Sequence, residues 1–374
     1  MTAQPSASLP FANLSSESIR KFATSIAGEI ILPDDERYQK ARRVWNHVID
    51  KHPAMIARCA GADDVCRAIE FARENELLTA VRSGGHSFAG YGVCDGGLVI
   101  ELSLIKVATV DPVHQRITIG GGVAAEELDC LAQAFKMAVP LGSCMTVGVS
   151  GYALGGGESS LTPKFGYGCD SISRVEVVTA DGRVLTSRDG ENDDLFWAMR
   201  GAGANFGVAT ALEFRLHPIE KVLSGHLRYP IRQAKKVLRF LDEYTPSIPD
   251  DLFILAAVLP HPGERMLDVA VVWPDEEKKG ERAIRPLRKF LKPFEDTVQT
   301  GDYLDEQRAG SDSPADGDYS SHRRGGHFER LTEETVEVIA EYASNAPSAS
   351  SGITMMYWHG PWKRTPLSLR QFPR

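Results

Sequence analysis

The sequence lacks several features that mark common classes of protein. Its 374 residues contain no apolar run near the ~20 residues of a membrane-spanning helix, and no basic start followed by an apolar stretch. The formal net charge of −8 argues against a nucleic-acid surface, which needs concentrated Lys and Arg. We therefore expect a cytoplasmic protein that binds neither a membrane nor a nucleic acid.

Cysteines are few and scattered. They are Cys59, Cys66, Cys94, Cys130, Cys144 and Cys169. No two form a CxxC pair, and none stands at a zinc-like spacing from a histidine, so no metal site is expected. The ordinary role of such a cysteine is that of a small buried apolar side chain. Cys144 is the exception argued below.

The length of the chain predicts two domains. Residues 1–40 are polar and predict a loose arm with one helix from Glu17 to Ala27. Over 41–220, short strands and helices mix without the regular alternation of a doubly wound sheet, which favours an α+β fold. Residues 221–374 predict a second domain, an antiparallel sheet backed by amphipathic helices.

Glycines gather in the first domain. RSGGHS, at 82–87, follows an apolar strand, and its glycines either let backbone N–H groups converge on an anion or make a tight turn. The segment 141–157 contains six glycines, which predicts a flat or charged ligand against the backbone. GAGANFG, at 201–207, follows a helix and precedes a strand, so it is not a nicotinamide fingerprint. Gly120–Gly122 predicts a strand-to-helix corner.

Four motifs in order carry a specific resemblance. RSGGHS followed by AGYG, then PLGSCMTVGVSGYALGGG, then EVVTADGRV, then DDLFWAMRGAGANFGVAT resemble the PCMH-type FAD-binding domain of the vanillyl-alcohol-oxidase superfamily. More narrowly, the chain is similar to the berberine-bridge-enzyme-like oxidases, over roughly residues 50–218. The resemblance implies a two-subdomain FAD-binding domain over 41–220 and a substrate-binding domain over 221–374. It also implies FAD bound covalently through His86, at the flavin 8α-methyl, and Cys144, at flavin C6.

The resemblance implies the rest of the cofactor site as well. The 82–87 backbone should hold the pyrophosphate with help from Arg82, and the backbone of Val208 should contact the adenine region. The other nine histidines are expected to be surface or core residues. The cofactor-binding set is Arg82, Ser83, Gly84, Gly85, His86, Ser87, Gly142, Ser143, Cys144, Val147, Gly148, Gly151, Tyr152, Gly155, Gly156, Gly157, Gly207 and Val208.

The sequence departs from the family pattern in three places. Glu158 and Ser159 follow GGG, where relatives have an aromatic residue and another glycine, and an acid beside a flavin would disfavour its anionic reduced form unless the side chain faces solvent. Tyr152 stands where some relatives have a histidine near the flavin pyrimidine ring. KRTPLSLRQFPR resembles a segment that in relatives lies well before the end, so we expect the C-terminal part that commonly supplies a catalytic tyrosine base to be missing.

No replacement for that base is evident, and Tyr319, Arg324 and Tyr357 are the weak candidates. The function expected is an oxidase that takes a hydride from an alcohol, sugar or secondary-metabolite hydroxyl to FAD and then to O2, giving peroxide. Two alternatives stay open: a flavin-binding protein without catalysis, and a dehydrogenase with another electron acceptor. The partners expected are a small-molecule substrate and O2, with the chain as a monomer or homodimer.

Overall fold

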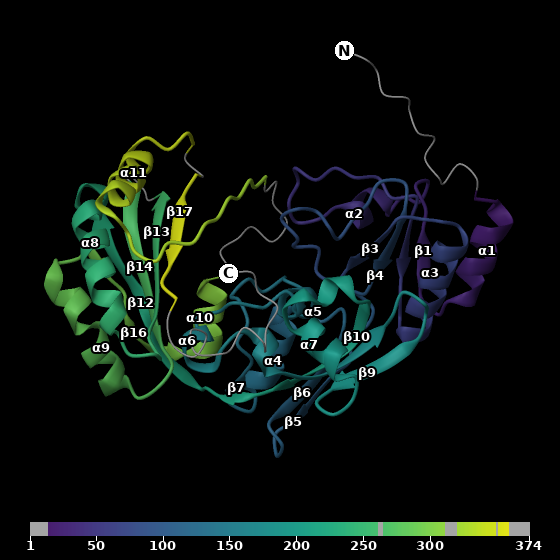
Figure 1. Ribbon diagram of the computed structural model, residues 1–374, viewed down its shortest axis with the longest axis horizontal. Helices are drawn as coiled ribbons and strands as arrows, with labels where there is room; N and C mark the ends of the chain where they lie inside the picture. Colours follow the sequence, from purple (N-terminus) through teal and green to yellow (C-terminus); the bar gives the residue numbers. More distant parts are fainter. Residues whose placement is uncertain (1–13, 261–264, 311–319, 349–350, 359–374) are drawn as a thin grey trace, which may run out of the picture.

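The computed structural model describes residues 14–260, 265–310, 320–348 and 351–358. Over these residues three main sheets follow one another along the long axis of the molecule, each with helices on one side (Figure 1). Within the described ranges no helix combines the length and apolar character needed to cross a membrane. The mixed helix-and-sheet architecture confirms the predicted α+β class.

The first sheet comes from the N-terminal part of the chain, in the order β1-β2-β4-β3. β2, β4 and β3 are parallel, and β1 is antiparallel to β2. The elements are α1 (Ser16–Ser25), β1 (Glu29–Ile31), α2 (Tyr38–Arg42), β2 (Met55–Arg58), α3 (Ala62–Glu74), β3 (Thr79–Arg82) and β4 (Leu98–Glu101). Over residues 14–40, which the structure describes, the predicted helix is present as α1 and packs on α3, and β1 joins the sheet.

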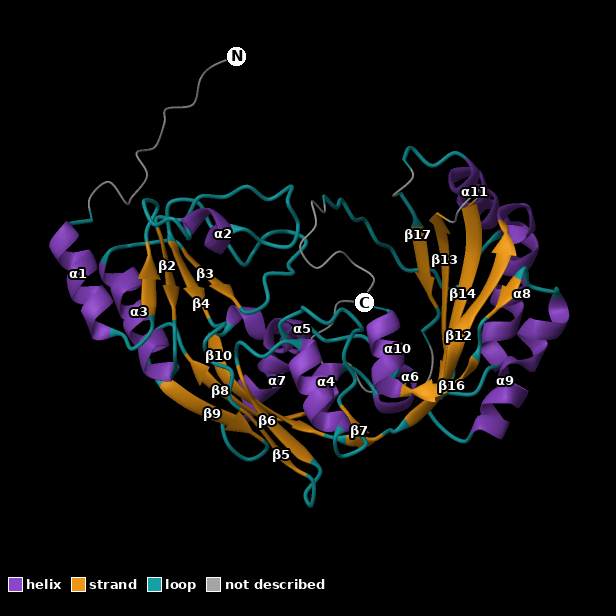
Figure 2. Cartoon of the chain, turned by 180° about the vertical axis from the view of Figure 1, so that it is seen from behind, coloured by secondary structure: helices purple, strands orange, loops and turns teal. Residues whose placement is uncertain are grey.

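The second sheet is antiparallel, in the order β5-β6-β10-β8-β9, and α4, α5 and α7 lie over one side of it (Figure 2). A two-stranded pair, β7 with β11, lies beside it. The elements are β5 (Ala108–Asp111), β6 (Arg116–Gly120), α4 (Ala125–Gln133), β7 (Met137–Ala138), α5 (Val149–Leu154), α6 (Thr162–Phe165), β8 (Ile172–Val178), β9 (Val184–Arg188), α7 (Asp193–Ala202), β10 (Val208–Arg215) and β11 (His217–Pro218). GAGANFG lies between α7 and β10, which confirms the helix-then-strand context that excluded a nicotinamide fingerprint.

The third sheet is antiparallel, in the order β15-β12-β14-β13-β17, with β16 also paired to β12. Helices α8, α9 and α11 cover one face, and the other face is turned toward the rest of the molecule (Figure 1). The elements are β12 (Lys221–Pro230), α8 (Ala234–Tyr244), β13 (Phe253–Pro260), β14 (Arg265–Trp273), α9 (Glu277–Phe290), β15 (Glu295–Asp296), β16 (Gln299–Asp302), α10 (Tyr303–Ala309), α11 (Glu333–Ser344) and β17 (Ile353–Met356). This sheet begins at Lys221; the domain boundary near 220 stays a prediction.

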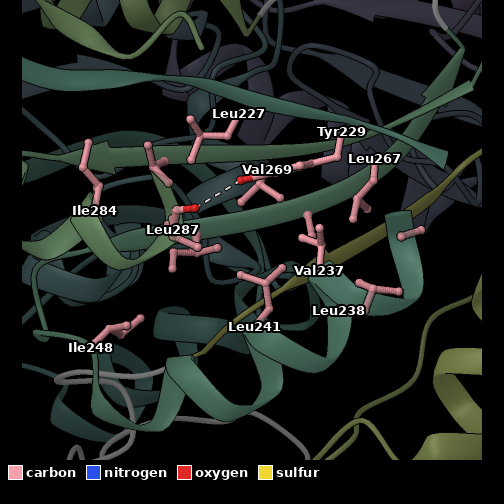
Figure 3. Packing of buried hydrophobic residues seen from close by; sticks show 14 of the residues in the cluster. Leu227, Tyr229, Val237, Leu238, Leu241, Ile248, Leu267, Val269, Ile284 and Leu287 are labelled. Atoms are coloured by element: carbon pink, nitrogen blue, oxygen red, sulfur yellow. Dashed lines mark hydrogen bonds between the residues drawn. The ribbon is translucent and has the colours of Figure 1, made fainter. Parts of the chain in front are cut away.

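Alternation along the strands decides which face of the third sheet is apolar. On β12, Leu227 and Tyr229 point to the helices, where they meet Val237 and Leu241 of α8 and Leu287 of α9 (Figure 3). The Tyr229 hydroxyl donates to the Leu287 carbonyl at 3.4 Å, so its polar atom is paired inside the core. The residues between them in sequence point to the opposite face, because side chains alternate along a strand.

Two segments between β16 and β17 return to the first two sheets. Helix α10 packs against α4. Farther along, the side-chain amide of Asn46 pairs with the backbone of Ser321, donating to its carbonyl at 3.0 Å and accepting from its N–H at 3.0 Å. Next to this pair, the Arg323 guanidinium lies 3.9 Å from the centre of the Phe88 ring. Residues 320–323 are thus attached beside the loop that follows β3.

Candidate active site

Two glycine loops meet through their backbones. The first, residues 82–87, follows β3, and the second, residues 141–148, precedes α5. A Cβ atom added at Gly84 would lie 2.2 Å from the backbone nitrogen of Gly148, and one added at Gly148 would lie 2.3 Å from the nitrogen of Gly84. Only residues without a Cβ allow this approach. The sequence predicted that a ligand would lie against these glycines; the structure shows that these two lie against each other.

A third glycine segment fixes the position of both loops. The Ser83 hydroxyl donates to the Gly121 carbonyl at 2.7 Å, and the Ser150 hydroxyl donates to the same carbonyl at 2.6 Å. A Cβ at Gly121 would lie 2.4 Å from the Ala209 carbonyl oxygen, so this residue too is held in contact with backbone. The segment joins the end of β6 to the start of α4, as the sequence predicted for a strand-to-helix corner.

His86 and Cys144 converge on one hydroxyl group. The Thr146 Oγ1 atom lies 2.9 Å from His86 Nε2 and 3.9 Å from Cys144 Sγ. His86 and Cys144 are 58 positions apart in sequence. The distance between His86 Nε2 and Cys144 Sγ therefore cannot exceed the sum of these two distances. Each side chain comes from a different loop, so the backbone contact between Gly84 and Gly148 is what brings them together.

The surroundings of His86 favour a neutral imidazole. Its ring stacks on Trp45, with centroids 5.5 Å apart, and Trp45 in turn meets Phe88 edge to face. Burial lowers the pKa of His86. A neutral imidazole keeps one nitrogen lone pair, which is the form that can bond to carbon.

The remaining members of the first loop shape its turn. Gly85 has φ of 73°, a left-handed conformation that favours glycine, and its carbonyl accepts the Trp45 N–H at 3.0 Å. The Ser87 hydroxyl accepts the backbone N–H of Tyr91 at 3.2 Å. These contacts hold His86 between Trp45 and Thr146.

Arg82 has a role that its sequence position did not reveal. Its guanidinium is buried and donates to the backbone carbonyls of Ala41, at 2.6 Å, and Arg43, at 3.4 Å. Burial lowers the pKa of Arg82, and the nearby Glu101 carboxylate opposes that shift. Arg82 therefore holds the end of α2 beside the first loop. Its predicted help in binding a pyrophosphate stays a prediction.

The second loop is fixed at both of its ends. The Val147 N–H donates to the Cys144 carbonyl at 3.2 Å, and the Val147 carbonyl accepts the N–H of Ala125, the first residue of α4, at 2.9 Å. A Cβ at Gly142 would lie 2.6 Å from the Tyr152 hydroxyl, so Gly142 makes room for that ring. Ser143 faces α10, because a Cβ at Gly310 would lie 2.4 Å from its hydroxyl.

Helix α5 offers an open surface beside the two loops. Nothing in the described structure lies within 4 Å of a Cβ built at Gly151, and a Cβ at Gly155 would make only an ordinary contact, 3.5 Å from the Gly151 carbonyl. Gly156 and Gly157 have φ of 123° and 77° and turn the chain away after the helix. Of the predicted α5 positions, Gly151 is the one whose missing side chain leaves open space for a ligand.

Tyr152 and Glu158 form a buried contact near the second loop. The Tyr152 hydroxyl donates to the backbone carbonyl of Glu158, and burial raises the pKa of Tyr152. Burial also raises the pKa of the Glu158 carboxyl, and a hydrogen bond with the Trp358 side chain opposes this shift. Glu158 is therefore half-buried and held by a residue that follows β17.

Gly207 and Val208 line a hollow between the first two sheets. Gly207 has φ of 144°, and a Cβ there would lie 2.5 Å from the Val178 carbonyl, so the chain passes close to β8 at this point. The hollow is lined from the first sheet by β3 and α3, and from the second by β8 and the start of β10. Its position fits the predicted contact of Val208 with the far end of a dinucleotide cofactor.

The three weak candidates for a catalytic base lie in different parts of the chain, and the two described ones differ in burial. Tyr319 lies outside the described residues. Arg324 is exposed on the segment 320–330. Tyr357 packs against the core beneath α8, α9 and α11, and burial raises its pKa; a catalytic role for it stays a prediction. Because side chains alternate, Tyr357 shares the helix-facing side with Ile353 and Met355, and the sequence pattern of β17 carried that signal.

Sequence reasoning missed a buried acidic pair where α10 meets α4. Gln307 donates to Asp129 Oδ2 at 3.2 Å and to the Leu141 carbonyl at 3.2 Å. Burial raises the pKa of Asp129 to about 7. Burial, and then the charge of Asp129, raise the pKa of Glu306 to about 7. The Tyr303 hydroxyl is buried beside them, without a hydrogen-bond partner among the described residues.

Comparisons with known proteins agree with this geometry. Residues 53–188 match the model of an FAD binding domain. The chain is 42% identical over 212 residues to (R)-6-hydroxynicotine oxidase of Paenarthrobacter nicotinovorans, covering 56% of this chain and 46% of that protein. It is 28% identical over 346 residues to an FAD-linked oxidoreductase of Dictyostelium discoideum, covering 91% and 75%. Its structure resembles xylooligosaccharide oxidase from Myceliophthora thermophila with a TM-score of 0.82 at 25% identity, covering 94% and 79%.

The fold, the loops and these matches agree: residues 53–188 match an FAD binding domain, and the chain is similar to FAD-linked oxidoreductases and oxidases. It spans about half the length of the hydroxynicotine oxidase and about three quarters of the Dictyostelium protein.

Proposed function

We propose that this protein is an FAD-dependent oxidase that binds its flavin through two covalent bonds, from His86 and Cys144. The observation that carries the proposal is the convergence of these two side chains on Thr146, at 2.9 Å and 3.9 Å. A flavin whose benzenoid edge entered at this point would meet a nitrogen and a sulfur nucleophile side by side.

The residues around this point fit a flavin. Gly151 leaves open surface on α5, and Gly207 and Val208 line the hollow between the first two sheets, so one extended cofactor could reach both. Bound flavin supplies a two-electron acceptor. The chain holds the imidazole neutral by burial and fixes both loops through the Gly121 carbonyl. The protein's contribution is therefore position: two nucleophiles held at one edge of the ring system.

The proposed substrate is a small molecule with a hydroxyl group, such as an alcohol, a sugar or a secondary metabolite. Oxidation of such a carbon releases one hydride and one proton, and the proposed final acceptor is O2, which gives peroxide. The name of one relative, xylooligosaccharide oxidase, refers to a substrate rich in hydroxyl groups. The open face of the third sheet, turned toward the loops, would provide the wall against which the substrate lies.

Acid denaturation tests the covalent bonds directly. After precipitation of the purified protein, the yellow colour is expected to remain with the polypeptide. His86→Ala and Cys144→Ala should each leave flavin joined by a single bond, with different absorbance spectra, and the double variant should release all of it. Cys66→Ala is the matched control, because Cys66 is also half-buried but lies on α3. Free flavin released from the unmutated protein would contradict both bonds.

Anaerobic mixing tests the reaction. Addition of a suitable alcohol or sugar should bleach the oxidised flavin band, and admission of O2 should restore it with peroxide release. Bleaching without recovery in O2 would indicate a dehydrogenase with another acceptor. A covalently bound flavin that no member of a broad panel reduces would leave a binding protein without catalysis, and would overturn the oxidase proposal.

A further inference from the structure

The strand register arranges the side chains on the open face of the third sheet in rows. In the lowest row, Ser224, Val272 and Phe253 are cross-strand partners. Val272 and Phe253 of this row pack on Leu161 and Phe165, which lie at α6 beside the second sheet. Cross-strand partners share a face of the sheet. The rows above the lowest one therefore continue up a wall that starts at the flavin-binding part of the molecule.

The next row up contains His226, paired across the sheet with Ala270, which is paired in turn with Leu255. The row above that contains Arg228, paired with Asp268. His226 lies two residues beyond the packed lowest row, a distance of about 7 Å along the strand. It is the first polar side chain above the junction between the sheet and the flavin-binding part.

His226 is held by a chain of charged groups. Its Nδ1 atom lies 2.9 Å from Asp268 Oδ1, while Arg228 Nε donates to Asp268 Oδ2 at 3.3 Å. Arg228 also donates to Glu295 Oε2 at 2.5 Å. The Asp268 side chain is 9% exposed and that of His226 is 42% exposed. The carboxylate is thus largely buried, whereas the imidazole is partly exposed.

Helix α10 connects His226 with the Cys144 loop. At one end of the helix, Gln307 donates to the Leu141 carbonyl, and Gly310 touches Ser143, one residue before Cys144. On the same helix, Glu306 is close enough to His226 for the imidazole to lower the pKa of its carboxyl. His226 and Cys144 therefore border the same short helix, one from the sheet and the other from the loop.

We propose that His226 is the proton acceptor of this enzyme, with Asp268 as its positioning residue. The inference rests on the proposed function. The hydroxyl O–H bond of the substrate breaks and its proton goes to His226 Nε2. The adjacent C–H bond would break with both electrons, bound oxidised flavin would supply the acceptor for that hydride, and the C–O bond would become C=O. Asp268 accepts a hydrogen bond from the Nδ1–H group of His226. This leaves the Nε2 lone pair as the proton acceptor, because neutral imidazole donates from one nitrogen and accepts at the other.

This arrangement supplies a base of a different kind from the tyrosine implied by the family resemblance. The charged groups that face His226 are Asp268 from β14, Arg228 from its own strand, Glu295 from β15 and Glu306 from α10. Histidine generally changes charge between pH 5 and 8, and only the neutral form accepts a proton. Flavin reduction should therefore require the neutral form of His226.

The test compares His226→Gln with a matched control in the full chain. His114 makes a similar pair with Asp111, 2.7 Å from Nδ1 to Oδ2, on the exposed turn between β5 and β6. In anaerobic mixing with a panel of sugars and secondary alcohols that includes xylobiose, His226→Gln should slow flavin reduction about 100-fold or more. His114→Gln should leave this rate unchanged, and the flavin content of both variants should match the unmutated protein.

A second readout does not depend on turnover. In protein labelled with 15N-histidine, the NMR signals of His226 should show the proton on Nδ1, and Asp268→Asn should shift this tautomer while leaving His114 unchanged. Reduction that survives His226→Gln at the normal rate, or an Nδ1 without its proton in the unmutated protein, would overturn the inference and leave the oxidase proposal standing. Failure of the whole panel to reduce the unmutated protein would overturn the oxidase proposal itself.

Discussion

The flavin loops and the open face of the third sheet build their sites in opposite ways. In the loops, backbone meets backbone: Gly84 against Gly148, and Gly121 against the carbonyl of Ala209. On the sheet, regular strands carry the polar side chains of His226, Arg228 and Asp268 at positions that strand register alone determines. The first kind of site depends on residues that lack a side chain, and the second on side chains that any strand could hold.

This difference explains why the cofactor was easier to infer than the substrate. A backbone contact that admits only glycine restricts the sequence strongly, because any other residue adds a clash. A position on a regular strand accepts many residues, so its chemistry changes without changing the fold. The sequence of the loops therefore indicates the class of the protein. The residues on the open sheet face determine the chemistry that is particular to this chain.

The largest expected effect is a difference in unfolding free energy between substitutions at Gly148 and at Gly151. Gly148→Ala places a Cβ 2.3 Å from the nitrogen of Gly84 and forces the loops apart, so we expect a loss of about 3 kcal/mol of unfolding free energy and loss of bound flavin. Gly151→Ala, in the middle of α5 with open space around it, should stabilise the helix by about 1 kcal/mol. It should nevertheless weaken flavin binding, because the added methyl group occupies the ligand surface.

Urea unfolding followed by circular dichroism, with flavin absorbance in parallel, measures both variants. Normal stability of Gly148→Ala would contradict the claim that the loop site depends on residues without a side chain. Unchanged flavin binding by Gly151→Ala would contradict it as well.

A smaller effect tests the junction between the two kinds of site, where Asp129 and Glu306 are buried. Each has its pKa raised to about 7, so in the folded state these groups bind protons that the unfolded chain has already released. Their stabilising contribution is complete below about pH 4 and is lost as the pH rises through about 7. The unfolding free energy should therefore fall between pH 5 and pH 8, and Asp129→Asn should remove about 2 kcal/mol of that decrease.

The measurement is urea unfolding at several pH values for the variant and the unmutated protein. Glu126→Gln is the control, since Glu126 is an exposed carboxyl on the same helix, α4, and should leave the pH dependence unchanged. An Asp129→Asn protein with the same pH dependence as the unmutated one would show that this carboxyl is ionised at neutral pH despite its burial.

The smallest effect tests the two faces of β17. Tyr357→Phe removes a buried hydroxyl that has no hydrogen-bond partner among the described residues, so stability should stay equal or rise by up to about 1 kcal/mol, with activity unchanged. Trp358→Phe removes the hydrogen bond to Glu158 and should alter the flavin absorbance spectrum. Thermal melts and spectra of the two variants decide the matter. Loss of activity in Tyr357→Phe would indicate that Tyr357 belongs to the active site. It would contradict the assignment of Tyr357 to the helix-covered face of the third sheet.

Local patterns predicted much of the fold. The hairpin of β8 and β9 turns at Asp181 and Gly182, because Asp-Gly between two alternating runs suits a tight turn, and Gly182 has φ of 82°. Gly120–Gly122 forms the predicted corner, and the open face and the helix-covered face of the third sheet follow from alternation along its strands. Each of these features depends on neighbours in sequence, which a single sequence displays.

The features that were missed depend on partners far away in sequence. Arg82 binds carbonyl groups of residues 41 and 43, and any residue supplies a carbonyl, so no motif marks the contact. Asp129 meets Gln307 across 178 positions. His226 looked like one of nine ordinary histidines until the register set it beside Asp268. Polar pairs of this kind become visible only when the fold places their strands and helices together.

The pairing of Asn46 with Ser321 joins two parts of the chain that lie 275 positions apart in sequence. The polypeptide passes from β11 through strands β12 to β16, reaches the N-terminal part of the molecule, where two hydrogen bonds hold Ser321, and then returns to the third sheet through α11 and β17. Each such bond contributes about 1 kcal/mol, so separation of Ser321 from Asn46 costs only about 2 kcal/mol. Residues 218–221 stay held in that event, because the Ile219 N–H donates to the Lys136 carbonyl at 3.0 Å and the Ile219 carbonyl accepts from the Gln133 side chain at 2.9 Å.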